Sequence, residues 1–256
     1  MDGLSDLAWY YLSWEIPSEE EGGEEGDLEG RLERLNEWFE AGGGRGAGRA
    51  KMMSVQRRRA GLVAGKTVPR GGAYLEIPWE MVMGRAKALE WPELQRVYER
   101  AYELVTRHND RDDRDVASLN VLLCCYLLFR APAPYVEALP RSFDGHPLLR
   151  QLKLEDDGTA WSAARREARA SLRSFVVLCR CCARDADLPE VPRARYVWAY
   201  LIWTTRLITV SLPDTPQSAE LAFVPLVDMT NCRANGDCSR TVKESDDFAV
   251  IRTSEA

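Results

Sequence analysis

An aspartate and an asparagine follow an apolar stretch in the last part of the sequence. Residues 221–227 read LAFVPLV, and Asp228 and Asn231 come directly after them. Polar side chains at the point where a strand leaves the core are in a common position to hold a ligand. They also close ordinary Asx turns. The spacing alone fits these two interpretations equally well.

Residues 60–67, AGLVAGKT, resemble a phosphate-binding loop in which alanine replaces the first glycine. Such a loop needs a buried strand before it and a helix N-terminus after it, so that backbone N–H groups point at the phosphates. Three arginines precede this segment and VPRGG follows it, so neither element is expected. A nucleoside triphosphate site is therefore not predicted.

Cysteine and histidine are the residue types that hold metals or act as nucleophile and base. Cys179 and Cys182 form a C-x-x-C pair, but no second pair stands at zinc-ligand spacing, and both lie on an apolar helical stripe. We interpret them as core residues. His108 and His146 have no nucleophile motif near them in the sequence, and we interpret them as surface residues. No metal site is predicted.

The elements that must position these residues are short strands near both ends and helices between them. Clustered apolar residues predict strands over residues 52–56, 61–64, 73–77, 221–227 and 248–252. Helical spacing predicts helices over residues 31–41, 94–105, 116–129, 172–182 and 196–204, with a charged loop over 107–115. This order predicts an α+β fold: a small β core, residues 51–80 and 221–252, split by a helical insertion of about residues 81–205.

Charge and composition narrow the class of protein. The 256 residues contain 34 Lys and Arg against 40 Asp and Glu, a net charge of −6. Nucleic-acid-binding proteins are normally basic, and no apolar run reaches the ~20 residues of a membrane helix. We therefore expect neither nucleic acid nor a membrane as partner. Seven cysteines without disulfide-type spacing, and no leader pattern in residues 1–17, predict a cytoplasmic or nuclear protein.

The N-terminal region contains an acidic, low-complexity stretch. Residues 18–30 read SEEEGGEEGDLEG and contain one aliphatic side chain. Blocks of like charge rarely pack against a core. We therefore predict that residues 1–30 form a disordered acidic segment.

Four segments match, in order, the motifs of one enzyme family. They are residues 59–64 with LEIP at 75–78, PYVEALP at 134–140, WTTR at 203–206, and LAFVPLVDMTN at 221–231. Together they resemble the SET-domain protein methyltransferases. The branch they resemble has a split SET domain and contains the Rubisco large-subunit lysine methyltransferase and the actin-histidine methyltransferase. The resemblance covers about residues 31–256.

The resemblance implies S-adenosylmethionine as cofactor and assigns residues to it. Arg206 would pair with the methionine carboxylate, a charge-assisted contact, and Asp228 would shape the pocket. The alternative for Arg206 is a charge that complements the dipole at a helix C-terminus. The remaining cofactor contacts would come from the backbone of Ala60, Gly61 and Leu62 and from Asn231 with Cys232, where the family has Asn-His. The resemblance assigns no catalytic side chain in this sequence.

The implied reaction is in-line transfer of the sulfonium methyl group to a lysine nitrogen of a non-histone protein. Its partner would be a lysine-containing protein segment. The family continues with G-E-x-I-x-x-x-Y-G, whose tyrosine closes the active site, whereas this sequence ends at Ala256. The comparison therefore predicts a C-terminally truncated chain with weak cofactor binding. The alternative is a catalytically inactive SET-like protein-binding module or a truncated gene product.

Ile208 is the residue expected to distinguish lysine from histidine. Histidine-specific relatives carry an asparagine two residues after the matching arginine, where it can hydrogen-bond an imidazole. Isoleucine offers no such partner, so the resemblance implies that Ile208 contacts a lysine substrate. The alternative is that Ile208 belongs to the apolar run of residues 201–210 and faces the core.

Overall fold

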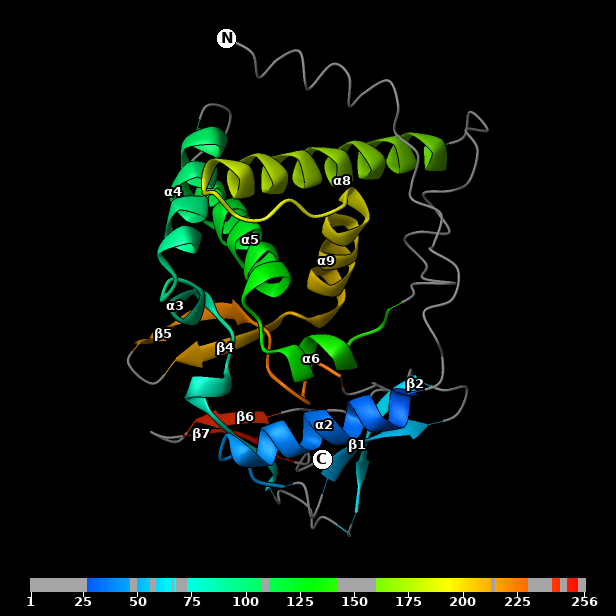
Figure 1. Cartoon of the computed structure of the whole chain (residues 1–256). Helices are drawn as coiled ribbons and strands as arrows, with labels where there is room; N and C mark the ends of the chain where they lie inside the picture. The colour runs from blue at the N-terminus through cyan, green and yellow to red at the C-terminus, as the bar shows by residue number, and fades with distance from the viewer. Residues whose placement is uncertain are drawn as a thin grey trace.

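Helices and small antiparallel sheets build the molecule, as the predicted α+β class requires. The computed structural model describes residues 27–46, 50–55, 59–65, 67, 73–106, 111–141, 160–212, 215–229, 241–244 and 248–252. Its helices are α2 (Leu28–Ala41), α3 (Arg85–Ala88), α4 (Pro92–Thr106), α5 (Arg111–Phe129), α6 (Ala133–Ala138), α8 (Ala160–Asp185) and α9 (Arg193–Arg206), with a 3-10 turn η3 (Trp79–Met81). Figure 1 shows α4, α5, α8 and α9 grouped on one side and α2 with β1 on the other, with α6 between them.

Within the described ranges, the strands form three antiparallel sheets. They are β1 (Ala50–Val55), β2 (Arg59–Ala64), β3 (Ala73–Pro78), β4 (Ile208–Leu212), β5 (Thr215–Ala222), β6 (Thr241–Glu244) and β7 (Phe248–Arg252). β1 pairs with β2, β4 with β5, and β7 lies between β3 and β6. The pairing of β3 with β7 joins the early strands to the last one, while α3 to α9 lie between them in sequence.

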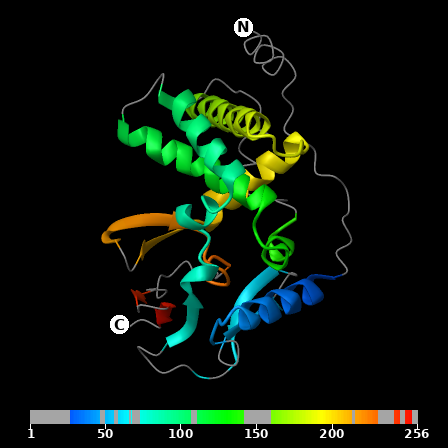
Figure 2. The same ribbon diagram turned by 60° about the vertical axis from the view of Figure 1, so that its left-hand side comes forward.

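Apolar helix faces supply most of the core between the helices. On α4, Leu94, Val97 and Ala101 are buried, and Pro92 occupies the first helical position, where its missing N–H costs nothing. α5 is buried nearly all round over residues 121–127. Figure 2 shows this helical layer from a second side, with the β4–β5 hairpin leaving it. The hairpin starts just after α9 and returns the chain to the end of the same helix.

The start of α2 corrects the prediction for the acidic N-terminal segment. Residues 1–26 lie outside the described part of the chain, but α2 begins at Leu28, three residues before the predicted start. The carbonyl of Asp27 accepts a hydrogen bond from Arg31 Nε at 3.3 Å, and Leu28 packs against the core. These contacts allow the last residues of the acidic stretch to form the first turn of a helix.

The charged residues before the buried part of α5 are helical too, so the predicted loop over residues 107–115 is wrong at its end. α5 begins at Arg111, and residues 107–110 lie outside the described part. Asp115 accepts a hydrogen bond from Arg85 Nη1 at 3.0 Å and another from the hydroxyl of Tyr98. Ser118 Oγ also donates to the carbonyl of Arg114 at 2.7 Å. Partners on α3 and α4 therefore hold this charged turn in place.

The predicted strand over residues 221–227 is wrong in its bounds. β5 begins earlier, at Thr215, and ends at Ala222. Residues 225–229 form turns, and Leu226 has a φ of +66°, which a regular strand does not allow. Val224 and Val227 are apolar because this turn is buried, so the apolar run marks burial rather than strand.

Candidate functional site

The β4–β5 hairpin brings the chain back to the end of α9. Arg206 is the last residue of α9, and Leu207 leaves the helix with extended backbone at φ −66° and ψ 137°. Ile208 then pairs with Ala222 at the open end of the hairpin. The next residue, Phe223, exchanges two backbone hydrogen bonds with Met83, at 3.0 and 3.2 Å. Residues 224–229 therefore return beside the end of α9.

Asp228 lies in this returning turn and contacts Arg206 through its backbone. The guanidinium of Arg206 donates from Nη1 to the carbonyl oxygen of Asp228 at 2.9 Å. The backbone N–H of Asp228 donates to the carbonyl of Val224 at 3.0 Å, which closes the turn. Two of the predicted site residues, Arg206 and Asp228, thus meet, although 22 positions separate them.

Tyr135 completes the group, and the sequence analysis gave it no role. It is 0% exposed on α6, and its hydroxyl donates to Oδ2 of Asp228. Its ring lies 6.3 Å from the ring of Phe223, tilted by 54°. The only signal in the sequence was an aromatic residue inside the proline-flanked motif PYVEALP. A motif of this kind does not reveal where a hydroxyl points.

Burial decides the electrostatics of this group. Asp228 is 6% exposed, and desolvation raises the pKa of its carboxyl group to about 7, although the Tyr135 hydroxyl and the Arg206 guanidinium both act to lower it. Burial, together with the neighbouring carboxylate, raises the pKa of Tyr135 well above its usual range. The second carboxylate oxygen, Oδ1, is buried and has no hydrogen-bond partner within the described part of the chain. The site therefore places a buried carboxyl group beside a cation.

Three of the other residues predicted to bind the cofactor lie on β2, and two lie outside the described residues. Ala60, Gly61 and Leu62 are on β2, in the sheet with β1, where Gly61 stands opposite Met53. Within the described ranges, the hydrogen bonds of Arg206 and Asp228 join α9, α6 and the turn over residues 224–229. Asn231 and Cys232 lie outside the described part of the chain. The structure thus joins two of the seven predicted residues by contact and adds Tyr135.

Ile208 is the first residue of β4 and stands two positions after Arg206. It is half-buried and packs against the edge of the hydrophobic core. Part of its side chain thus packs against the core, as the core interpretation predicts. The remaining part is exposed two residues from Arg206.

The remaining sequence motifs fall into the core or outside the described residues. Cys179 and Cys182 are buried on α8, as predicted, and burial raises the pKa of both thiols. Within the described ranges, no group of three or more His, Cys, Asp or Glu side chains could hold a metal. Residues 60–64 form a strand rather than a phosphate-binding loop. Both histidines lie outside the described part.

Among the described residues, no helix combines the length and the apolar character that crossing a membrane requires.

Comparison with known proteins identifies the fold. No family model and no curated relative matches the chain. Among solved structures, the SET domain of LSMT bound to lysine and AdoHcy is 16% identical over 88% of this chain, with a TM-score of 0.58. The same domain bound to methyllysine and AdoHcy gives 17% identity and a TM-score of 0.60. Rubisco LSMT bound to sinefungin and monomethyllysine gives 14% and 0.59.

The chain spans 51% of the length of each of these three structures. At this level of sequence identity, the comparison shows only that the fold is similar. The chain therefore has the fold of the SET domain found in Rubisco LSMT.

Proposed function

We propose that this chain is an S-adenosylmethionine-dependent methyltransferase whose target is a lysine side chain of a protein. The fold supports the proposal, because solved structures with this fold hold AdoHcy together with lysine or methyllysine. The observation that carries it is the position of Arg206. Its guanidinium stands at the end of α9 and is fixed by one N–H on the carbonyl of Asp228.

The residues at this site fit the amino-acid end of the cofactor. Arginine has five N–H donors, and the contact with Asp228 uses one nitrogen, Nη1, of Arg206. No carboxylate among the described residues forms an ion pair with Arg206, so its remaining donors suit the methionine carboxylate. The backbone of Ala60, Gly61 and Leu62, with Asn231 and Cys232, completes the proposed binding set.

The cofactor supplies an electrophilic methyl group when bound, and the chain supplies binding and orientation. Arg206 binds a carboxylate, and Asp228 holds Arg206 in place through its carbonyl. The target lysine must arrive without its proton, and apolar surroundings favour the neutral amine. The half-buried side chain of Ile208 provides such surroundings two residues from Arg206.

Ile208 also supports lysine rather than histidine as the target. An imidazole has two ring nitrogens that need hydrogen-bond partners when buried, and isoleucine provides none. A buried unpaired nitrogen costs about 1–3 kcal/mol. The aliphatic stem of lysine packs against isoleucine without such a cost. A lysine-containing protein segment is therefore the proposed substrate.

Cofactor binding tests the role of Arg206. Calorimetric titration of the full chain with S-adenosylhomocysteine should show binding that Arg206→Ala weakens by about tenfold or more, since a charge-assisted contact is lost. Arg206→Lys should recover part of the affinity. The matched control is Arg180→Ala on α8, where a partly exposed arginine pairs with Glu190 at 2.6 Å and no effect is expected. Equal loss in both variants, or no loss in Arg206→Ala, would refute the assignment.

A peptide array tests the substrate class. The full chain, incubated with labelled S-adenosylmethionine, should label peptides that contain lysine in preference to those that contain histidine. Ile208→Asn should shift the ratio toward histidine. Cofactor binding without labelling of any lysine peptide would support a binding module rather than an enzyme.

A further inference from the structure

Tyr135 joins two distant parts of the chain through one buried hydrogen bond. Its hydroxyl donates to Oδ2 of Asp228, which lies 93 positions later. Both side chains are buried, and the ring of Tyr135 also contacts Phe223 in the chain that leads into the same turn. A hydroxyl that reaches a buried carboxylate in this way fixes the position of the carboxylate.

Asp228 is held at three different atoms. Its carboxylate accepts from Tyr135, its carbonyl accepts from Arg206 at 2.9 Å, and its N–H donates to Val224 at 3.0 Å. The carboxylate that accepts from Tyr135 and the carbonyl that accepts from Arg206 thus belong to one residue held in a closed turn. Tyr135 and Arg206 are therefore linked by hydrogen bonds through Asp228.

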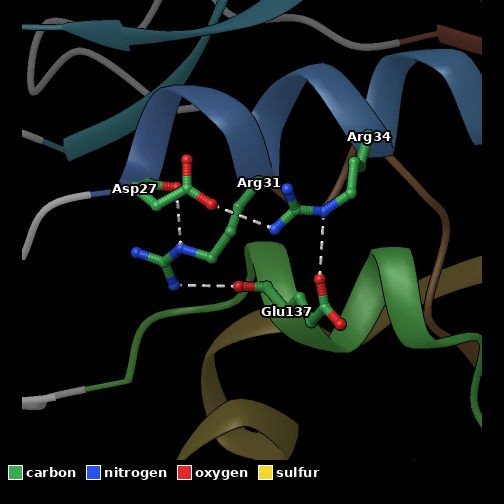
Figure 3. A network of polar contacts seen from close by, with 4 residues as sticks. All are labelled: Asp27, Arg31, Arg34 and Glu137. Atoms are coloured by element: carbon green, nitrogen blue, oxygen red, sulfur yellow. Dashed lines mark hydrogen bonds and ion pairs between the residues drawn. The ribbon is translucent and has the colours of Figure 1, made fainter. Parts of the chain in front are cut away.

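Contacts from two helices hold α6, which carries Tyr135. On one side, Arg31 of α2 donates from Nη1 to the carbonyl of Glu137 at 2.9 Å, and Arg34 Nε lies 3.3 Å from Glu137 Oε2. Figure 3 shows these contacts, with Asp27 joining both arginines at the start of α2.

On the other side, the indole of Trp198 on α9 donates to the carbonyl of Pro140, just after α6, at 2.8 Å. α6 is thus fixed between α2 and α9, the helix that ends in Arg206. Tyr135 stands on a short but well-anchored helix, which is what a positioning residue requires.

We propose that Tyr135 is a positioning residue for the cofactor site: its hydroxyl orients Asp228 and thereby the guanidinium of Arg206 toward the carboxylate of S-adenosylmethionine. This inference rests on the proposed function, because it names the device that keeps the proposed cofactor-binding arginine in place. Tyr135 is not a catalytic residue, since it acts through Asp228.

The arrangement gives the role of Tyr135 a specific pH signature. The charged and titratable groups that face Asp228 are Tyr135 from α6 and Arg206 from α9, and Tyr126 from α5 faces Tyr135 in turn. The Tyr135 hydroxyl stabilises the ionised carboxylate and lowers its pKa against the effect of burial. Removing the hydroxyl therefore moves the protonation of Asp228 to higher pH.

The test is Tyr135→Phe in the full chain, with Tyr200→Phe as the control. Tyr200 lies on α9, packs its ring against Phe175 and Trp203, and is not part of the site. Tyr135→Phe should weaken S-adenosylhomocysteine binding by about tenfold near pH 8, because a hydrogen bond to a charged group is lost. The midpoint of the pH dependence of binding should also rise, while Tyr200→Phe changes neither quantity. Wild-type affinity and an unchanged pH midpoint in Tyr135→Phe would overturn the proposal.

A second readout separates this proposal from the proposed function. The side-chain N–H signal of Arg206 in ¹H–¹⁵N spectra, assigned with Arg206→Lys, reports on the guanidinium without any ligand. It should shift in Tyr135→Phe and stay in place in Tyr200→Phe. If the wild type binds no S-adenosylhomocysteine but the Arg206 signal shifts, the function fails and the positioning contact stands. If the wild type binds but the signal and the affinity survive in Tyr135→Phe, the positioning role fails alone.

Discussion

The Asp228 site and the α2–α6 surface network, which consists of Asp27, Arg34 and Glu137, both place an arginine beside an acidic residue. The two differ in burial. Asp228 is 6% exposed, whereas the side chains of Asp27 and Arg34 are 66% and 47% exposed. Water screens the surface pairs and leaves them little net energy. In the core, burial raises the pKa of Asp228 to about 7 even with a hydroxyl and a guanidinium beside it. The same residue types therefore form weak, screened contacts on the surface and a proton-sensitive group inside.

Asp228→Asn is the substitution expected to change folding stability most. Between pH ~4 and ~7 folded Asp228 keeps a proton that the unfolded chain loses, so the folded state loses stability as pH rises through this window. Asparagine cannot ionise. The variant should therefore be more stable than the wild type by on the order of 3 kcal/mol near pH 8, and similar to it near pH 4. Urea unfolding at both pH values measures the difference, and a variant less stable at pH 8 would contradict the burial argument.

The burial of Arg31 is intermediate between that of Asp228 and that of the surface pairs. Its substitution should therefore have an intermediate effect on folding stability. It is 9% exposed, burial lowers its pKa, and its Nη1 donates to the carbonyl of Glu137 at 2.9 Å. Arg31→Met keeps most of the buried stem but removes the donor, so about 1–2 kcal/mol of stability should be lost. Thermal unfolding at two salt concentrations gives the size and shows whether the loss is independent of salt. A loss that vanishes at high salt would place Arg31 with the surface pairs.

Arg34→Ala should have the smallest effect. Its hydrogen bonds to Asp27 and Glu137 raise its pKa, but all three side chains are substantially exposed. Exposed pairs of this kind contribute little and are screened by salt. The unfolding midpoint should stay within experimental error of the wild type in high salt. A clear destabilisation there would show that the α2–α6 network is more than a set of screened surface contacts.

The sequence predicted secondary structure correctly where buried residues recur at helical spacing. Leu94, Val97 and Ala101 on α4 and Val176 and Cys179 on α8 lie at helical spacing, and the structure buries them as predicted. β7 also has the predicted bounds, Phe248–Arg252. In these elements the local pattern and the tertiary contacts agree, so the pattern suffices.

The sequence was least informative where a contact far along the chain decides the local structure. The turn at Asp228 follows an apolar run that favours a strand, yet Leu226 has positive φ and the turn is buried against Tyr135. Arg85 and Tyr98 hold Asp115 in the helix by hydrogen bonds. The local sequence pattern around Asp115 does not predict these contacts. The family motifs identified Arg206 and Asp228. They did not reveal that the Tyr135 hydroxyl joins this pair to α6, because that hydrogen bond links residues 93 positions apart.

The pairing of β3 with β7 also affects the order in which the molecule can form. Pro78 stands opposite Phe248, so about 170 residues must be synthesised before β3 meets its partner, and closing so long a loop is slow. The helices between them contact one another across shorter separations in sequence, so they can assemble first. During synthesis on the ribosome β3 therefore waits, with its edge unpaired by β7, until the last described strand has emerged.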